Sequence, residues 1–343
     1  MNIARKLRTL IYSAFFLLLT FLILANSSTS LYYALNGLNL WFTKMIPALF
    51  PFMILSGIMV RLQLTQQFAT LLHPLLHPIL KGGKNVTYAV IMGFLCGFPM
   101  GAKVTCDLLE RNMITHREAE FLLAFCNNIG PVYFCSFVIP LLHRQLVWPY
   151  LLGMYALPFL YGAVLRRTAF RDLDEAGSDY CPGGHKAGAV GFFNRTKRGN
   201  KELVLCEDKS QRSLSLLEQV DDAITSSIQS ILMLGGYMIL FNLLNLIPHV
   251  LCQGSRLFSW LPEVLAPVLE ITGGLGMLGD SRPLLALLVL PFGGLSCIAQ
   301  TYSMIKNTSL TLRPYIIHKV VLTGITAVFY AGWHFLFPAS FLL

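Results

Sequence analysis

The residues best suited to chemistry lie within one apolar segment, Gly93-Phe-Leu-Cys-Gly97-Phe-Pro99-Met-Gly101-Ala-Lys103. Three glycines and a proline interrupt a helix there, which frees backbone N–H and C=O groups. Each freed group is costly in lipid unless protein, water or a solute satisfies it. Broken helices at membrane depth are therefore typical of chains that line a transport cavity. We predict such a cavity beside this stretch.

Lys103 is the cation of this stretch. A lysine at the centre of a bilayer costs about 2.5–3.5 kcal/mol on insertion scales, so it should have a partner. An anionic solute is one candidate, helped by the N–H groups freed at the break. Asp107, one helical turn later, is another, and the side chain could instead extend to the membrane interface. We favour the solute.

Two further stretches carry polar groups at helix breaks. Asn127-Asn128-Ile129-Gly130-Pro131 places two carboxamides beside a Gly-Pro break, which favours a cavity wall over a simple kink that joins helices. Gly293-Gly294 is followed by Ser296, Gln300 and Thr301, which offer neutral hydrogen-bonding groups. Helix packing through small residues explains this last stretch equally well.

The composition indicates the class of protein in which these residues are placed. The chain has 343 residues, of which 55% are hydrophobic and 13% charged, and its mean hydropathy is +0.61. This predicts an all-α polytopic membrane protein. The eight cysteines form no CxxC pair and imply packing rather than a disulfide framework or a metal site. The apolar segments are 9–25, 40–60, 86–108, 118–142, 146–165, 223–247, 263–280, 283–305 and 314–337.

Four regions follow from this pattern. Residues 1–38 are expected to form a retained transmembrane helix and an outer loop, with a cleaved signal peptide as the alternative. Residues 39–165 form a first repeat with a connecting helix, and 166–222 form a hydrophilic cytoplasmic loop. Residues 223–343 form a second repeat.

The repeat rests on short matches between the halves. They are Leu55-Ser-Gly57 with Leu234-Gly-Gly236, Gly97-Phe-Pro-Met-Gly101 with Gly293-Gly-Leu-Ser-Cys297, and Thr105, Thr115 and Arg117 with Thr301, Thr311 and Arg313. All but the first pair share an offset of 196 residues. Glycine-interrupted segments in matched positions point to a transporter binding site.

The distribution of positive charge predicts the topology. If 86–108 is a re-entrant hairpin and the N-terminus is cytoplasmic, segments 1–8, 61–85, 110–117 and 166–222 lie inside and hold 18 of the 26 Lys and Arg. This agrees with the positive-inside rule, whereas a fully spanning 86–108 would put the basic segment 110–117 outside. Three crossings then invert the second repeat, with its hairpin within 263–305 on the outer side and the C-terminus inside.

Enzyme and nucleic-acid functions are not indicated. The chain has no HExxH, no GxSxG, no P-loop and no GxGxxG that opens a helix after a strand, so we expect no enzyme, no cofactor and no ATPase. The basic residues behind the net charge of +9 are placed as expected for orientation in the membrane, so this charge does not imply a nucleic-acid partner.

Three motifs together resemble a known family. Leu49-Phe-Pro-Phe-Met-Ile-Leu-Ser-Gly57, Cys96-Gly-Phe-Pro-Met-Gly-Ala-Lys103 and Phe125-Cys-Asn-Asn-Ile-Gly-Pro131 are similar to the YlbJ-type sporulation integral membrane proteins. This family belongs to the nucleoside-recognition or gate-domain group, which is related to concentrative nucleoside transporters. The resemblance runs from about Trp41 to the C-terminus, outside 166–222, and Gly293-Gly-Leu-Ser-Cys-Ile-Ala-Gln300 carries it in the second half.

The resemblance implies an inverted repeat with two hairpins and a role in an endospore-forming bacterium. It implies export of dipicolinic acid from the mother cell across the outer forespore membrane. This planar aromatic dianion suits Lys103 as a counter-ion and Phe98 and Tyr133 as stacking partners. The family motifs map onto Gly97, Pro99, Gly101, Lys103, Asn127, Asn128 and Pro131. Acidic residues near the hairpins are few, so ion coupling and facilitated export both stay open.

Our main hypothesis is therefore a multi-pass membrane transporter or facilitator for a small anionic aromatic solute, with both termini cytoplasmic. Self-association into a homo-oligomer stays open. The alternatives are a symporter of nucleosides or other neutral solutes, which would not need Lys103, and a non-transporting assembly protein of the spore envelope. The expected solute-binding residues are Gly97, Phe98, Pro99, Gly101, Lys103, Asn127, Asn128, Gly130, Pro131, Gly293, Gly294, Ser296 and Gln300.

Overall fold

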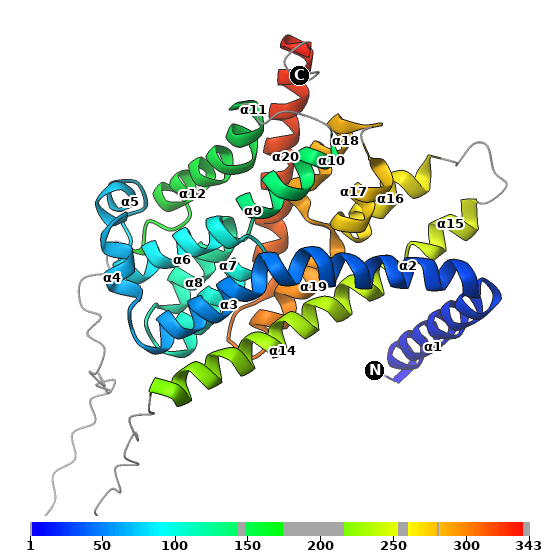
Figure 1. The fold of residues 1–343 in the computed structure, drawn as a ribbon, viewed down its shortest axis with the longest axis horizontal. Helices are drawn as coiled ribbons and strands as arrows, with labels where there is room; N and C mark the ends of the chain where they lie inside the picture. The colour runs from blue at the N-terminus through cyan, green and yellow to red at the C-terminus, as the bar shows by residue number, and fades with distance from the viewer. Residues whose placement is uncertain (1, 143–147, 174–215, 253–259, 280, 339–343) are drawn as a thin grey trace, which may run out of the picture.

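The structure is a computed structural model that describes residues 2–142, 148–173, 216–252, 260–279 and 281–338. All regular secondary structure in these ranges is helical (Figure 1). Within these ranges, six helices could cross a membrane by length and composition, which agrees with the predicted all-α polytopic class. They are Arg5–Ala25, Ser27–Arg61, Trp148–Arg167, Leu216–Cys252, Pro283–Ile305 and Leu312–Leu336.

The first part of the chain forms twelve helices and helical turns up to the gap at 143–147. They are α1 (Asn2–Ala25), α2 (Ser27–Leu40), η1 (Trp41–Met45), α3 (Ile46–Arg61), α4 (Thr65–Thr70), α5 (His73–Leu80), α6 (Lys84–Cys96), α7 (Met100–Glu110), α8 (His116–Phe125), α9 (Pro131–Tyr133), η2 (Phe134–Val138) and α10 (Ile139–Leu141).

The later part of the chain continues the bundle. It contains α11 (Trp148–Leu151), η3 (Leu152–Ala156), α12 (Leu157–Arg167), α14 (Leu216–Leu243), α15 (Leu246–Cys252), α16 (Leu261–Leu269), α17 (Ile271–Leu278), α18 (Pro283–Val289), η5 (Leu290–Phe292), α19 (Gly294–Ile305) and α20 (Leu312–Leu336).

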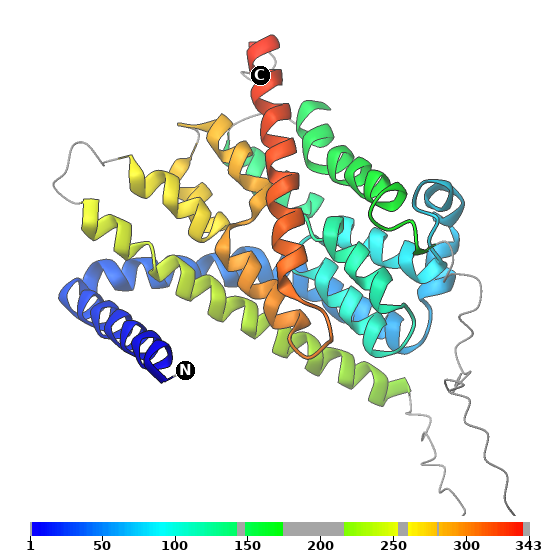
Figure 2. The same ribbon diagram turned by 180° about the vertical axis from the view of Figure 1, so that it is seen from behind.

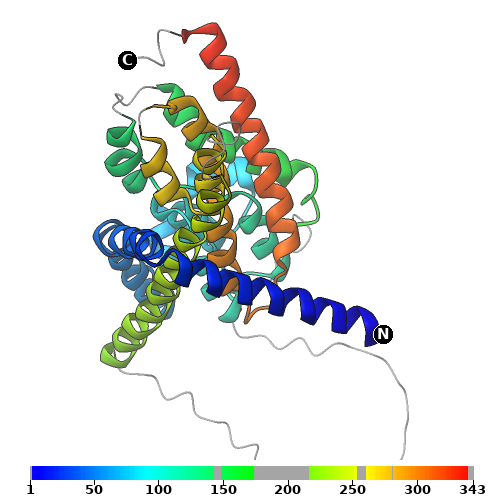
Figure 3. The ribbon, with the colours of Figure 1, turned by 90° about the vertical axis from the view of Figure 1, so that its right-hand side faces the viewer.

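Two long helical segments form one wall of the bundle. The continuous run of α2, η1 and α3 packs along α14, as Figures 1 and 2 show from both sides. The Trp41 indole nitrogen donates to the Ile231 carbonyl at 3.0 Å. Gly235 makes room for this ring, because a Cβ atom there would lie 2.4 Å from it. The helix α1 packs little against the rest and leaves residues such as Leu17 exposed (Figure 3).

Two pairs of short helices fold back on themselves. The first pair is α6 and α7, which approach closely at Gly93 because a Cβ atom there would lie 3.3 Å from the Gly101 Cα. The second is α16 and α17, where a Cβ atom at Gly274 would lie 2.1 Å from the Pro267 nitrogen. Each turn is short, so both pairs reverse direction within the bundle.

Two other breaks do not reverse the chain. The helix α8 ends at Phe125 and the chain resumes in α9 at Pro131, whose missing N–H and fixed φ suit the first turn of a helix. Likewise α18, η5 and α19 together form one of the candidate membrane spans. The glycine break at Gly293 therefore lies within a candidate membrane span, whereas the break at Gly97 lies at the turn of a folded-back pair.

Several loops meet at one end of the bundle. Arg61 on α3 donates to the Asp222 carbonyl of α14 at 3.2 Å, and Arg166 on α12 donates to the Leu80 carbonyl at 2.8 Å. His116 at the start of α8 lies 3.3 Å from the Ser309 carbonyl, which precedes α20.

The proximity of His116 and Ser309 bears on the proposed repeat. The offset of 196 residues equates Thr115 with Thr311, and both residues directly precede a helix, as expected. An inverted pair would place these two residues at opposite ends of the bundle, but the structure places them at the same end. The offset therefore matches local helix starts and does not describe how the halves are arranged.

The opposite end is joined by different contacts. The Tyr330 hydroxyl near the end of α20 donates to the Tyr150 carbonyl on α11 at 2.9 Å. Arg282 and Glu263, before α18 and in the first turn of α16, form an ion pair at 3.2 Å. The helix α20 therefore runs from the end that contains His116 to the end that contains Tyr150 (Figure 1).

Candidate functional site

The break at Gly97 packs directly against the break at Gly130. Gly97 has a φ of +80°, and a Cβ atom there would lie 2.2 Å from the Gly130 nitrogen. The Phe98 N–H donates to the Asn128 carbonyl at 2.6 Å. The N–H and C=O groups freed at two separate helix breaks thus partly satisfy each other within the protein.

Helix breaks in the second half of the chain lie next to the breaks at Gly97 and Gly130. Gly293 has a φ of +76°, and a Cβ atom there would lie 2.8 Å from the Phe98 ring. Gly294 lies against the α16–α17 turn, because a Cβ atom there would lie 3.1 Å from the Leu269 carbonyl oxygen. Four interruptions of helices, distant in sequence, therefore converge on one region.

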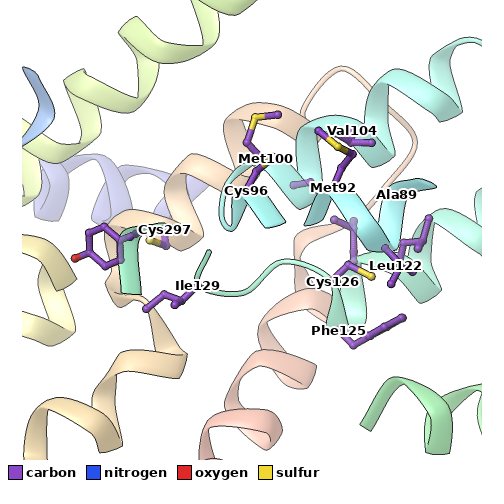
Figure 4. Packing of buried hydrophobic residues seen from close by; sticks show 14 of the residues in the cluster. Ala89, Met92, Cys96, Met100, Val104, Leu122, Phe125, Cys126, Ile129 and Cys297 are labelled. Atoms are coloured by element: carbon purple, nitrogen blue, oxygen red, sulfur yellow. The ribbon is translucent and has the colours of Figure 1, made fainter. Parts of the chain in front are cut away.

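A small cavity lies where these breaks meet. Its volume of about 30 Å³ has room for one or two ordered waters. Figure 4 shows part of its surroundings, with Ile129 beside Cys297 and with Met92, Cys96, Met100 and Val104 packed together on α6 and α7. The cavity is lined by Met45, Ala48, Leu49, Cys96, Phe98, Ile129, Gly130, Tyr133, Leu234, Met238, Glu270, Ile271, Thr272, Cys297 and Gln300.

Glu270 is the charged residue of the cavity lining. It is only 1% exposed and caps α17, where its carboxylate accepts from the Thr272 and Gly273 N–H groups at 3.1 and 2.6 Å. Asn242 on α14 donates to the same carboxylate at 3.0 Å. Backbone and carboxamide donors thus hold this buried carboxylate, as the cost of its desolvation requires.

Asn127 connects the first-half break to the second half of the chain. Its side-chain nitrogen donates to the Thr301 hydroxyl at 2.9 Å and to the Tyr315 hydroxyl at 3.1 Å. Its carbonyl oxygen accepts from the Lys319 ammonium at 2.8 Å. Its side-chain oxygen is buried and has no hydrogen-bond partner among the described residues.

Lys103 is not among the residues that line the cavity, and it has partners of its own. Its Nζ is 3.4 Å from the Asp107 carboxylate and 3.2 Å from the Ser226 hydroxyl on α14. The side chain is 7% exposed and is not part of the cavity lining. Of the partners that the sequence offered, the structure shows the internal pair with Asp107.

The other predicted site residues divide into two groups. Phe98, Gly130 and Gln300 line the cavity. Gly97, Pro99, Gly101, Asn127, Asn128, Pro131, Gly293, Gly294 and Ser296 lie at the same breaks but are not part of the lining. Of these, Ser296 accepts from Gln300 at 2.9 Å, and the Asn128 side chain donates to the Phe125 carbonyl.

Two residues at the site were not selected from the sequence as binding residues. Glu270 and Lys319 are ionisable residues inside the predicted apolar segments 263–280 and 314–337. Such residues in a membrane span indicate function by default, and that signal could have identified both of them. The short glycine motifs drew the prediction to the first half instead.

A second, larger cavity lies at the end of the bundle where the basic loops meet. Its volume is about 740 Å³. It is lined by Gln63, Gln66, His73, His77, Leu80, Lys81, Gly82, Gly83, Lys84, Asn85, Val86, Arg111, Met113, Ile114, Thr115, Glu118, Phe121, Arg166 and Leu173. Burial lowers the pKa of His73, and the nearby His77 and Lys84 lower it further.

Most of these residues come from three of the four segments that the charge pattern assigned to one side of the membrane, 61–85, 110–117 and 166–222. Outside this cavity, Arg117 donates to Asp172 at 2.9 Å, and this hydrogen bond lowers the pKa of the exposed Asp172 carboxyl. Basic residues thus gather at one end of the bundle, as the positive-inside rule expects of cytoplasmic loops.

Comparisons with known proteins agree with the motifs. No family model matches the chain, and no solved structure matches it. Among curated proteins, the chain is 26% identical, over an alignment 364 positions long with gaps, to the sporulation integral membrane protein YlbJ of Bacillus subtilis (strain 168). The match covers 97% of this chain and 86% of that protein. The resemblance of this chain to the YlbJ-type sporulation integral membrane protein family is thereby confirmed.

Proposed function

We propose that this chain is a transporter or facilitator that moves a small anionic aromatic solute across a membrane during sporulation. The observation that carries the proposal is the convergence of four helix breaks on one cavity within a bundle of membrane-spanning length. Helix breaks in transporters line the solute site, because the solute satisfies backbone groups that lipid cannot. The name of the similar protein supports the role in sporulation, and the family resemblance favours dipicolinate, carried across the outer forespore membrane.

The proposal includes an inverted repeat whose units differ from those of the sequence offset. The first unit consists of α2 to α3, the folded-back pair α6–α7, the interrupted segment α8–α9 and then α12. The second consists of α14, the pair α16–α17, the interrupted segment α18–α19 and then α20. In this arrangement the pairs are re-entrant hairpins that enter from opposite sides of the membrane, and the turn at Glu270 corresponds to the turn at Gly97.

This topology changes the expected place of the C-terminus. Residues 283–305 now cross the membrane, so the end of α20 lies outside while the N-terminus stays inside. Lys306 and Arg313 then join the cytoplasmic basic residues, which become 20 of the 26 Lys and Arg. The topology predicted from the sequence places only 18 of these residues on the cytoplasmic side. The larger number supports the new arrangement.

The site offers a solute both apolar walls and fixed charges. Phe98 and Tyr133 line the cavity and offer aromatic faces. Because about 30 Å³ is far less than a solute with an aromatic ring needs, this structure corresponds to a closed state. Transport then requires the two hairpins to move apart on one side of the membrane at a time.

The test is uptake by the purified protein in liposomes. Radiolabelled dipicolinate and uridine are offered separately to protein-containing and protein-free vesicles, each at inward and outward solute gradients. Protein-dependent dipicolinate flux supports the proposal. If vesicles that contain folded protein take up neither dipicolinate nor uridine, this result would support the envelope-assembly alternative and overturn transport.

A neutral polar solute such as a nucleoside is the second candidate, and Glu270 favours it. A buried carboxylate at the cavity wall accepts hydrogen bonds from hydroxyl groups and repels a solute anion. This candidate predicts that uridine competes for uptake and that Glu270→Gln abolishes uridine flux. Flux of dipicolinate alone, unaffected by excess uridine, would exclude it.

A further inference from the structure

We infer that Lys319, and not Lys103, is the residue that binds a carboxylate of the transported solute. This inference rests on the proposed function and names the part of the site that selects for negative charge. Lys319 lies on α20, the last helix of the chain, and reaches the junction where the breaks of both halves meet.

The position of the ammonium group is fixed by two contacts. Lys319 Nζ donates to the Asn127 carbonyl at 2.8 Å and lies 4.8 Å from the centre of the Phe98 ring. The Asn127 carbonyl belongs to the non-helical connection after α8, so a backbone acceptor freed by a helix break positions the lysine. Phe98 in turn lines the cavity, so one aromatic ring contacts both the cation and the solute space.

Among the described residues, no carboxylate balances the charge of Lys319. The side chain is 3% exposed, and none of the ion pairs among the described residues includes it. A carbonyl oxygen and an aromatic face stabilise a buried ammonium less than a carboxylate does. Lys103, by contrast, already has Asp107. Of these two buried lysines, Lys319 is therefore the one for which a solute anion supplies a missing partner.

The Phe98 ring controls access from the cavity to this ammonium. Gly293 allows the ring to take its position, because a Cβ atom at Gly293 would lie 2.8 Å from the ring. Movement of the α6–α7 turn that carries Phe98 would uncover the ammonium, and the planar solute could then stack on the same ring. The side-chain oxygen of Asn127, which has no partner among the described residues, lies on the residue that holds Lys319 and offers an acceptor there.

Glu270 sets the polarity of the site. It lines the cavity and is held by donors from α14 and α17, whereas Lys319 reaches the same junction from α20. Like-charge repulsion from Glu270 favours the orientation in which a carboxylate of the solute lies toward Lys319. The site therefore selects for at least one carboxylate and fixes the orientation of the solute.

The experiment measures binding of a ligand series to purified protein by titration calorimetry. The ligands are dipicolinate, picolinate and pyridine-2,6-dicarboxamide. Picolinate has one carboxylate, and the diamide has the shape of dipicolinate without its charge. The wild type should bind the diamide about 10- to 100-fold more weakly than dipicolinate, because a charged hydrogen bond is lost. Equal binding of dipicolinate and diamide by the wild type would overturn the inference without any variant.

The variants assign this preference to a residue. Lys319→Gln keeps a donor for the Asn127 carbonyl and should lower the affinity for dipicolinate to that for the diamide. Lys103→Gln is the matched control and should keep the wild-type preference for the carboxylates. Loss of the preference in Lys103→Gln but not in Lys319→Gln would assign the carboxylate to Lys103 and overturn the inference. A wild type that does not transport dipicolinate would instead contradict the proposed function.

Discussion

Lys103 and Asp107 form an ion pair on one face of α7, with Nζ 3.4 Å from the carboxylate and side chains only 7% and 19% exposed. Removing one partner leaves a poorly hydrated charge, so Asp107→Asn should lower the free energy of unfolding by about 1–3 kcal/mol. The double variant Lys103→Met/Asp107→Leu should recover most of this loss. Thermal unfolding of the wild type, Lys103→Met, Asp107→Leu and the double variant in detergent measures the coupling, and additive effects of the two substitutions would contradict it.

Gly97 should tolerate no side chain. An added Cβ atom would lie 2.2 Å from the Gly130 nitrogen, and the residue has a φ of +80°. Gly97→Ala should therefore destabilise the protein by about 3 kcal/mol through overpacking and backbone strain. Gly324→Ala on α20 is the control, because nothing lies within 4 Å of its added Cβ atom. The melting temperatures of both variants test this, and an unchanged Gly97→Ala would argue against the contact between the breaks.

Arg166 should matter far more than its neighbour Arg167. Arg166 is 2% exposed and donates to the carbonyls of Leu80, Lys81 and Phe170. Arg166→Met leaves these acceptors without their donor, so we expect a loss of about 2–4 kcal/mol. Arg167→Met removes an exposed side chain and should change stability by less than about 1 kcal/mol. Similar melting temperatures for the two variants would refute the structural role of Arg166.

The proposed topology predicts from which side of the membrane a reagent labels each loop. Glu110→Cys and Ser309→Cys should react with a membrane-impermeant thiol reagent from the same side, because their loops meet at the contact between His116 and Ser309. Ser281→Cys, near the opposite end, should react from the other side only. All eight native cysteines are first replaced by alanine or serine. Labelling of the Ser309 and Glu110 variants from different sides would instead support the topology predicted from the sequence, in which the C-terminus lies inside.

Local sequence showed where helices break but not how the chain continues after the break. Gly97, Gly130 and Gly293 all lie at interruptions, because glycine and proline act on their own turn of helix. Whether the next helix reverses, as after Gly97, or continues, as after Gly293, depends on packing between segments distant in sequence. The offset of 196 residues therefore matched two breaks whose surroundings differ.

The residues that we propose for binding were harder to predict for a related reason. Lys103 stands within a conspicuous glycine motif, and the competing partner, Asp107, was visible one turn away. Lys319 lies in an ordinary apolar helix, and only the fold brings it to Asn127, 192 residues earlier in the chain. Glu270 likewise becomes part of the site only when α16 and α17 fold back beside α19.

The small volume of the central cavity has an electrical consequence. A space that holds one or two water molecules cannot contain a continuous file of water across the bilayer, so in this state it offers protons and small ions no aqueous path. In this state the central cavity therefore gives no path along which the voltage across the membrane would be lost.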